Sequence, residues 1–176
     1  MTACPCAQGM VGDLARERLT ERGFSNEEIE QVLEAVPIAT HNQRGIGTLY
    51  VGCPEGWPAD IDARDLLEIV QGSMSSEIYG LLKRPDELAV VEKAHSQPRF
   101  VEDCVREMIR RVAEAYPALH DDAFVMARQE NLETIHRHNV VAERYGTAVD
   151  LRRELENGEH LPRHLTMREW LESPAS

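Results

Sequence analysis

Apolar and polar residues alternate with two different periods along this chain, and these periods predict most of its helices and strands. The clearest helix is predicted over residues 99–116, because apolar residues recur there at intervals of three and four while charged residues fill the other face. Its apolar positions are Val101, Cys104, Val105, Met108, Ile109 and Val112. Shorter helices are expected over residues 12–22, 26–36, 62–78, 86–95 and 166–172. Gly23 and Ser25 suit the end of the first and the N-cap of the second.

Strands are predicted over residues 44–53, 122–129 and 139–146, where β-branched and aromatic residues gather between turn-forming segments. The segment 130–138 joins the last two strands, so they are expected to pair. One strand, then helices, then a strand pair favours the α+β class with a mainly antiparallel sheet. A chain of 176 residues is expected to form one domain.

Charge narrows the classes of partner. The formal net charge is −12, which argues against an extended nucleic-acid surface because phosphates would be repelled. A small phosphate pocket lined by a few Arg and Lys stays open. No apolar run reaches the length of a membrane span, so no membrane contact is expected. No basic stretch followed by an apolar stretch opens the chain, so we expect no secretory signal and a cytoplasmic location.

Four cysteines stand at positions 4, 6, 53 and 104. In a reducing compartment they are not expected to form structural disulfides. Cys104 belongs to the apolar helix face, and Cys53 is interpreted as a buried thiol at the end of a strand. The Cys4-Pro5-Cys6 run is unusual. A redox pair is disfavoured there because a ring closed between residues two apart is strained.

Metal-capable side chains concentrate in three segments outside the apolar faces, each beside a predicted strand or turn. They are Cys4 with Cys6, His41, and the group Glu133, His136 and His138. Such donors suit zinc or iron(II), but Cys-x-Cys and His-x-His spacings fit a closed structural zinc site poorly, since the histidine pair would alternate across a strand. Spacing alone leaves open a catalytic metal, a structural metal and no metal.

Other polar residues have a simple interpretation from the sequence. Glu77 and Glu92 are placed on helices, where a solvated face is the ordinary role of a glutamate. The remaining histidines are expected at the surface; they are His95, His120, His160 and His164.

Four longer stretches together carry a resemblance to a known family. They are "ACPCAQ", "VPIATHNQRGIGTLYV", "SSEIYGLLKRPDELAVVEKAHSQPRFVEDCVREM" and "ENLETIHRHNVVAE", which extend from Ala3 to Glu143. This combination resembles GTP cyclohydrolases distinct from the common zinc enzyme, a group of bacterial type IB and archaeal type IV (methanopterin-pathway) members. The two predicted helices between Cys6 and His41 are more similar to the archaeal subtype.

The resemblance implies a tunnelling fold over residues 1–150, followed by a polar C-terminal extension over 151–176. In that fold an antiparallel sheet has helices packed on one face, oligomerisation forms a barrel, and the sites lie between subunits. The implied activity is hydrolysis of GTP at C8 with formate release, giving a dihydroneopterin phosphate for pterin, folate or methanopterin synthesis. The archaeal product, 7,8-dihydroneopterin 2′,3′-cyclic phosphate, is favoured.

The resemblance also implies roles for individual residues. One divalent metal is expected per site, Fe²⁺ being favoured over Mn²⁺ or Zn²⁺. Cys6 and His41 are the first ligands, with Pro5 fixing the approach of Cys6 in a turn. Around the metal, as ligands or in acid–base roles, the resemblance adds Glu77, Glu133 and His136. Cys6, Glu133 and His138 are the catalytic candidates, His138 for proton transfer.

The substrate-binding candidates follow from the same resemblance. The carboxylate of Glu92 is expected to accept hydrogen bonds from the guanine N1–H and amino group. Phosphate contacts are expected from Arg44, Lys83 and Arg84, although a solvated role is equally open for them.

One departure concerns length, because family members are about twice as long and carry a second copy of the fold. This sequence is then a natural half-size relative or a fragment. A lone half would leave sheet edges unpaired, so we expect a homo-oligomer that binds GTP. Two alternatives stay open: a relative that acts on another purine or stops at ring opening, and a non-catalytic module that completes a barrel with a partner half.

Overall fold

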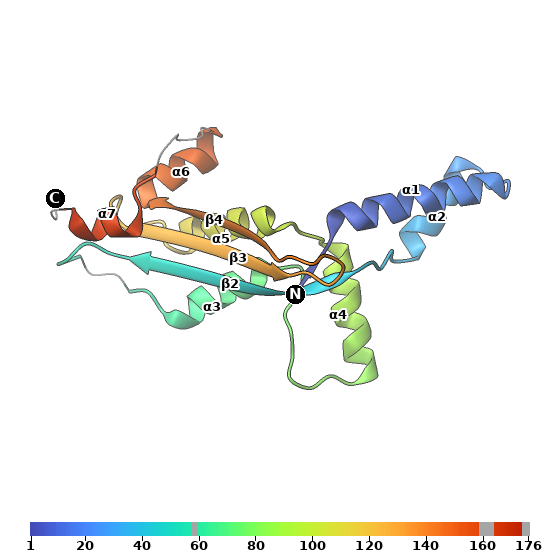
Figure 1. Cartoon of the computed structure of the whole chain (residues 1–176), viewed down its shortest axis with the longest axis horizontal. Helices are drawn as coiled ribbons and strands as arrows, with labels where there is room; N and C mark the ends of the chain where they lie inside the picture. The colour runs from blue at the N-terminus through green and yellow to red at the C-terminus, as the bar shows by residue number, and fades with distance from the viewer. Residues whose placement is uncertain (58–59, 159–163, 174–176) are drawn as a thin grey trace. The chain divides into compact units, whose positions relative to one another are not determined.

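The computed structural model describes residues 1–57, 60–158 and 164–173, and it has the predicted α+β architecture (Figure 1). Its elements in chain order are β1 (Thr2–Ala3), α1 (Pro5–Glu21), α2 (Asn26–Ala35), β2 (Asn42–Gly52), α3 (Ala63–Gly72), α4 (Arg84–Ser96), α5 (Val101–Ala115), β3 (Phe124–Leu132), β4 (Val140–Thr147), α6 (Ala148–Asn157) and α7 (Met167–Glu172). The three predicted strands and the helix over 99–116 are therefore confirmed to within a few residues.

The four strands form one sheet in the order β1-β2-β3-β4, and neighbouring strands run antiparallel (Figure 1). At its first pairing, Thr2 lies opposite Gln43 and Ala3 opposite Asn42. The chain divides into two compact units. The first unit comprises Met1–Gly45, Met74–Phe100 and Asn131–Asn139, and the second comprises Ile46–Ser73, Val101–Glu130 and Val140–Ser176.

The second unit holds the main apolar core. Helix α5 packs on β4, with α3 and α6 packed beside it. Each residue of the predicted α5 face is 6% exposed or less. Burying such an aliphatic side chain contributes about 1.5–3 kcal/mol, so this face fixes the helix on the sheet. Leu49, Val51 and Ala127 meet the same core from the strands.

An aromatic side chain from α7 packs on the opposite face of these strands. The ring of Trp170 lies 5.7 Å from that of Phe124, and its Nε1–H donates to the carbonyl of Asp122 at 2.7 Å. Phe124 and Val125 are adjacent, so they point to opposite faces of β3. Helices therefore contact both faces of the second unit's strands, whereas the sequence predicted packing on one face.

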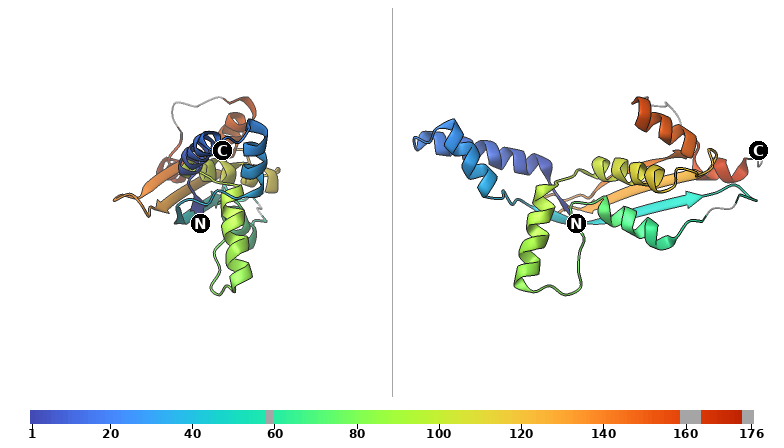
Figure 2. Two further views of the ribbon diagram at one scale, coloured as in Figure 1. Left: turned by 90° about the vertical axis from the view of Figure 1, so that its right-hand side faces the viewer. Right: turned by 180° about the vertical axis from the view of Figure 1, so that it is seen from behind.

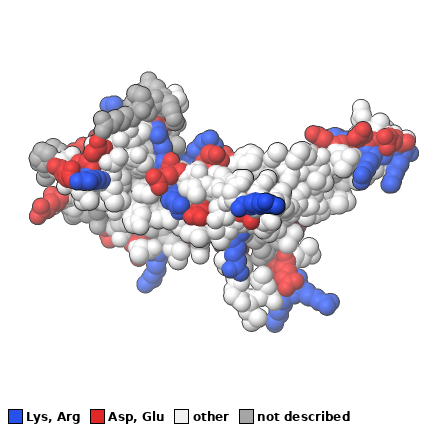
Figure 3. Space-filling view, in the orientation of Figure 1, with Lys and Arg blue, Asp and Glu red and all other residues white. Residues whose placement is uncertain are grey.

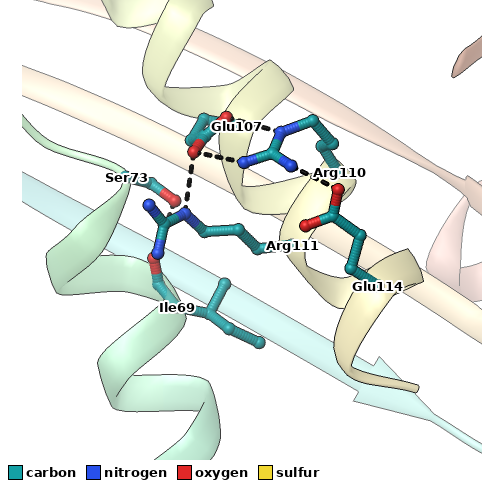
Figure 4. A network of polar contacts seen from close by, with 6 residues as sticks. All are labelled: Ile69, Ser73, Glu107, Arg110, Arg111 and Glu114. Carbon is teal, nitrogen blue, oxygen red and sulfur yellow. Dashed lines mark hydrogen bonds and ion pairs between the residues drawn. The ribbon is translucent and has the colours of Figure 1, made fainter.

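The exposed face of α5 carries a ladder of charged side chains (Figure 4). Glu107 binds Arg110 and Arg111 at 2.7 and 2.8 Å, and Arg110 also binds Glu114. Figure 4 shows Arg111 directed toward the end of α3. Each of these i, i+3 and i, i+4 pairs contributes about 0.2–0.5 kcal/mol, which supports the helix without deciding its position.

In the first unit, α1 and α2 form an antiparallel helical hairpin (Figure 2). Gly23 turns the chain with φ of +88°, a value that glycine adopts without strain. Ser25 caps α2 as predicted, because its hydroxyl accepts the N–H of Glu28 and the Glu28 carboxylate accepts the N–H of Ser25.

Helix α1 begins at Pro5 instead of residue 12. Two further differences from the sequence prediction, the end of one helix and an additional strand, arise from contacts with residues distant in the chain. The helix expected over 62–78 ends at Gly72. Beyond it, the Ser76 N–H donates to the carbonyl of Met1 at 3.1 Å, and the Ser75 hydroxyl accepts the N–H of Ala3. These bonds replace helical ones, and they place the short strand β1, which the sequence did not indicate.

Helix α6 was also missed, because its polar composition merges with the C-terminal segment. Thr147 caps it through a bond from the Asp150 N–H, and Leu151 is buried against α5 and β4. The helix crosses residue 150, where the sequence placed the boundary between domain and extension; that boundary stays a prediction.

The prediction of surface histidines was wrong for two of them. His95 is 4% exposed and His164 is 8% exposed. His164 packs against Gly146 and binds the Glu154 carboxylate at 3.0 Å, while that carboxylate also binds Arg144. His120 is half-buried, and His160 lies outside the described residues.

Candidate active site

Every residue predicted for the site belongs to the first unit, although the candidates span much of the chain. The helical hairpin and the segment after it contribute Cys6, His41 and Arg44. The segment between α3 and α4, with α4 itself, contributes Glu77, Lys83, Arg84 and Glu92, and the connection from β3 to β4 contributes Glu133, His136 and His138.

Cys6 lies in the first turn of α1 and is an exposed free thiol. The expected turn at Pro5 is instead a helix start, with Pro5 at the first helical position. Cys4 is the N-cap: its Sγ accepts the N–H of Ala7 at 3.4 Å. Cys4 thus shapes the backbone and leaves Cys6 as the exposed thiol of the pair.

His41 immediately precedes β2 and is half-buried. Its Nδ1 atom is buried and has no hydrogen-bond partner among the residues that the structure describes. A buried ring nitrogen without a partner is costly in an ordinary protein interior. It is therefore a candidate position for a bound group.

The segment after β3 is a series of bends, so the prediction that its histidines alternate across a strand was wrong. The rings of His136 and His138 are both exposed, with centroids 5.5 Å apart. Glu133 is half-buried at the start of this loop. The Thr134 hydroxyl donates to the carbonyl of Asn42 at 3.3 Å, which joins the loop to the residue that follows His41.

Glu77 lies in the connection before α4, not on a helix as predicted. Lys93 Nζ donates to its Oε2 at 2.6 Å. This hydrogen bond lowers the pKa of Glu77 below its usual value, with smaller contributions from a backbone hydrogen bond and the lysine charge. Glu77 is consequently held as a carboxylate. Lys93 was not among the residues predicted for the site, and its only signal in the sequence is its position beside Glu92.

The four substrate-binding candidates are exposed side chains. Glu92 is on α4, as predicted, and Arg44 is on β2. Lys83 and Arg84 stand at the start of α4, where the Asp86 carboxylate accepts the N–H of Lys83 at 2.9 Å. This end of α4 therefore presents two cations beside a fixed backbone turn.

The described residues contain no group of three or more His, Cys, Asp or Glu side chains placed to hold a metal ion. The available donors nevertheless fit a borderline divalent cation: a thiol, an imidazole with an unpartnered buried nitrogen, and carboxylates in one unit. The donor chemistry is therefore consistent with the predicted metal. Within the described residues of one chain, however, these donors do not come together around a single point.

Charged side chains of both signs are interspersed on the face shown in Figure 3. Among the described helices, none combines the length and apolar character needed to cross a membrane.

Comparisons with known proteins agree with the resemblance. A family model described as type I GTP cyclohydrolase folE2 matches residues 1–142. The chain is 51% identical over 155 residues to "GTP cyclohydrolase MptA" of Methanocaldococcus jannaschii, covering 88% of this chain and 49% of that protein. For the protein of the same name from Methanothermobacter thermautotrophicus, identity is 49% over 156 residues, covering 89% and 48%. The chain spans about half the length of these curated relatives. It belongs to the type I GTP cyclohydrolase folE2 family.

Proposed function

We propose that this chain is a GTP cyclohydrolase that hydrolyses GTP at C8 and releases formate. The observation that carries the proposal is the placement of all ten predicted site residues in one compact unit. The family match over residues 1–142 covers every one of them, and the relatives named GTP cyclohydrolase MptA align with most of the chain.

The metal would be held by Cys6 and His41, with Glu77, Glu133 and His136 as further ligands or acid–base groups. The buried, unpartnered Nδ1 of His41 and the carboxylate form of Glu77 support this assignment. When bound, a divalent cation lowers the pKa of water and supplies hydroxide near neutral pH. Fe²⁺ is the favoured ion, with Mn²⁺ and Zn²⁺ as alternatives.

The other candidates would bind and orient GTP. The exposed carboxylate of Glu92 accepts hydrogen bonds from two adjacent N–H groups on the guanine edge. Arg44, Lys83 and Arg84 are exposed cations that suit the phosphates. His138 moves a proton during ring opening, since an imidazole titrates near neutral pH.

The site would be completed by a second copy of the chain, in a tunnelling fold whose sheets join into a barrel. Cys6, His136 and His138 are exposed on one copy, which leaves them accessible to residues of another. The favoured product is 7,8-dihydroneopterin 2′,3′-cyclic phosphate, on the basis of the segment between Cys6 and His41, whose two helices α1 and α2 resemble the archaeal subtype.

Product mass spectrometry after incubation with GTP and anaerobic Fe²⁺ tests this proposal. Formate and a dihydropterin are expected, with the phosphate identified from the product mass. Formate without a pterin indicates that the reaction stops at ring opening. Metal-loaded oligomer that leaves GTP intact would contradict the proposed activity.

A further inference from the structure

His95 is a buried histidine that the sequence placed at the surface, and its ring contacts two separate parts of the first unit. Nδ1 lies 2.8 Å from the carbonyl oxygen of Val91, one turn earlier in α4. Nε2 lies 3.2 Å from the carbonyl oxygen of Thr40, the residue before His41. At 4% exposure, the ring has little access to water as an alternative partner. His95 therefore connects α4 to the segment that carries His41.

Gln8 makes a second connection at the same place. It lies in α1, two residues after Cys6, and its side-chain amide donates to the carbonyl of His95 at 2.8 Å. The same nitrogen lies 3.4 Å from the carbonyl oxygen of Ile38. One amide thus contacts both the end of α4 and the segment before His41.

Three segments with predicted site residues consequently meet at one set of hydrogen bonds. The start of α1 carries Cys6, residues 38–41 lead to His41, and α4 carries Glu92 one turn before His95. Side chains that bind backbone carbonyls constrain where the backbone lies, and the attached site residues move with it. Outer groups that orient metal ligands in this way typically change metal affinity or activity by about 10–100-fold when removed.

We propose that Gln8 and His95 are positioning residues that hold the Cys6 and His41 segments in register with α4. This inference rests on the proposed function, since it assumes that Cys6 and His41 act on the same metal ion. Neither residue is assigned contact with the metal or with GTP.

The first test replaces Gln8 with methionine, which keeps the length of the side chain and removes its donors. Arg16→Met is the control, because Arg16 on the same helix also binds another segment, through Glu30 at 3.0 Å, but lies far along α1 from Cys6. Cobalt(II) is the probe, read by the thiolate-to-cobalt absorption. Gln8→Met is expected to weaken cobalt binding about 10–100-fold and to lower kcat with little change in KM for GTP. Arg16→Met should retain both. Equal cobalt affinity in the two variants overturns the inference.

The second test separates the two contacts of His95. A glutamine side chain can place its amide nitrogen near the position of Nε2, whereas an asparagine reaches only the position of Nδ1. His95→Gln is therefore expected to retain cobalt binding better than His95→Asn, because only the former retains the contact with Thr40. Thermal unfolding of both variants identifies any general loss of stability. Equal loss of cobalt affinity at equal stability contradicts the positioning role.

The wild-type protein separates these outcomes from failure of the proposed function. Wild type that binds cobalt but leaves GTP unchanged contradicts the cyclohydrolase activity, while the variant series still decides the role of Gln8 and His95. Wild type that shows no thiolate-to-cobalt absorption overturns both.

Discussion

Lys93 Nζ lies 2.6 Å from Oε2 of Glu77, so a side chain of α4 fixes a carboxylate in the connection that precedes this helix. The bond lowers the pKa of Glu77 from its usual value of 4.5. A depressed carboxyl pKa means that the pair contributes stability above the unfolded-state pKa, and that this contribution is lost as the pH falls through the folded-state value.

Replacing Lys93 by methionine should therefore lower the free energy of unfolding at pH 7, by about 0.5 kcal/mol for a partly exposed pair. The difference from wild type should shrink as the pH falls below 4.5. Urea unfolding across this pH range measures it, with Lys93→Arg as the control that keeps the charge. A difference that is independent of pH would show that the pair does not act through ionisation of Glu77.

Cys6→Ser should abolish the thiolate-to-cobalt absorption and lower the rate of GTP ring opening by about a hundredfold or more, because the hydroxyl is a poor ligand at neutral pH. The matched control is Cys53→Ser. Burial raises the pKa of the Cys53 thiol, which disfavours its thiolate, and this residue belongs to the second unit. Absorption that follows Cys53 instead would move the metal away from the proposed site.

Glu92→Gln should raise KM for GTP while cobalt affinity stays at the wild-type value. The amide retains one acceptor oxygen but loses the charge, and hydrogen bonds to a charged group contribute about 1.5–3 kcal/mol, so KM should rise about 10–100-fold. Steady-state kinetics and cobalt titration of the same preparation measure KM and cobalt affinity separately. Weakened cobalt binding with unchanged KM would assign Glu92 to the metal instead of guanine.

Gly52→Ala should destabilise the protein, because a Cβ at this position would lie 2.9 Å from the Trp170 ring. The ring has little freedom to withdraw, since its Nε1–H is bound to Asp122 and its face lies near Phe124. Overpacking of this kind costs about 1–3 kcal/mol. Thermal unfolding measures it. In a Trp170→Leu background, Gly52→Ala should lower the free energy of unfolding much less. An equal loss in both backgrounds would contradict the contact between position 52 and the Trp170 ring.

Glu154→Ala should also destabilise the second unit, because Arg144 and the buried ring of His164 both lose the carboxylate that they bind. Leaving such groups without a partner costs about 1–3 kcal/mol. Glu154→Gln keeps an acceptor oxygen and should lose less stability than Glu154→Ala. Urea unfolding of the two variants gives the comparison, and an equal loss would mean that the charge, not the hydrogen bonding, is what stabilises this group.

The sequence determined the elements whose signals are local. The apolar period from Val101 to Val112 predicted α5 and its buried face, because a helix returns every third or fourth side chain to the same side. Ser25, as the expected N-cap, marked the start of α2, and the β-forming runs located β2, β3 and β4. The candidate site residues were identified from long motifs shared with a family. Such motifs can be recognised in the sequence even when the fold of the chain is not known.

Tertiary structure decided what depends on partners distant in the chain. The backbone from Ser75 to Ser76 leaves the helical pattern because Met1 and Ala3 offer it other hydrogen bonds. Helix α6 packs against α5 and β4 through the buried residues Ala148 and Leu151 in spite of its polar sequence. In the sequence alone, His95 cannot be told from any other polar residue near a helix end. Only the folded chain brings Thr40 and Gln8 into contact with it. A contact between segments dozens of residues apart produces no periodic pattern in the sequence, because the two segments come together only when the chain folds.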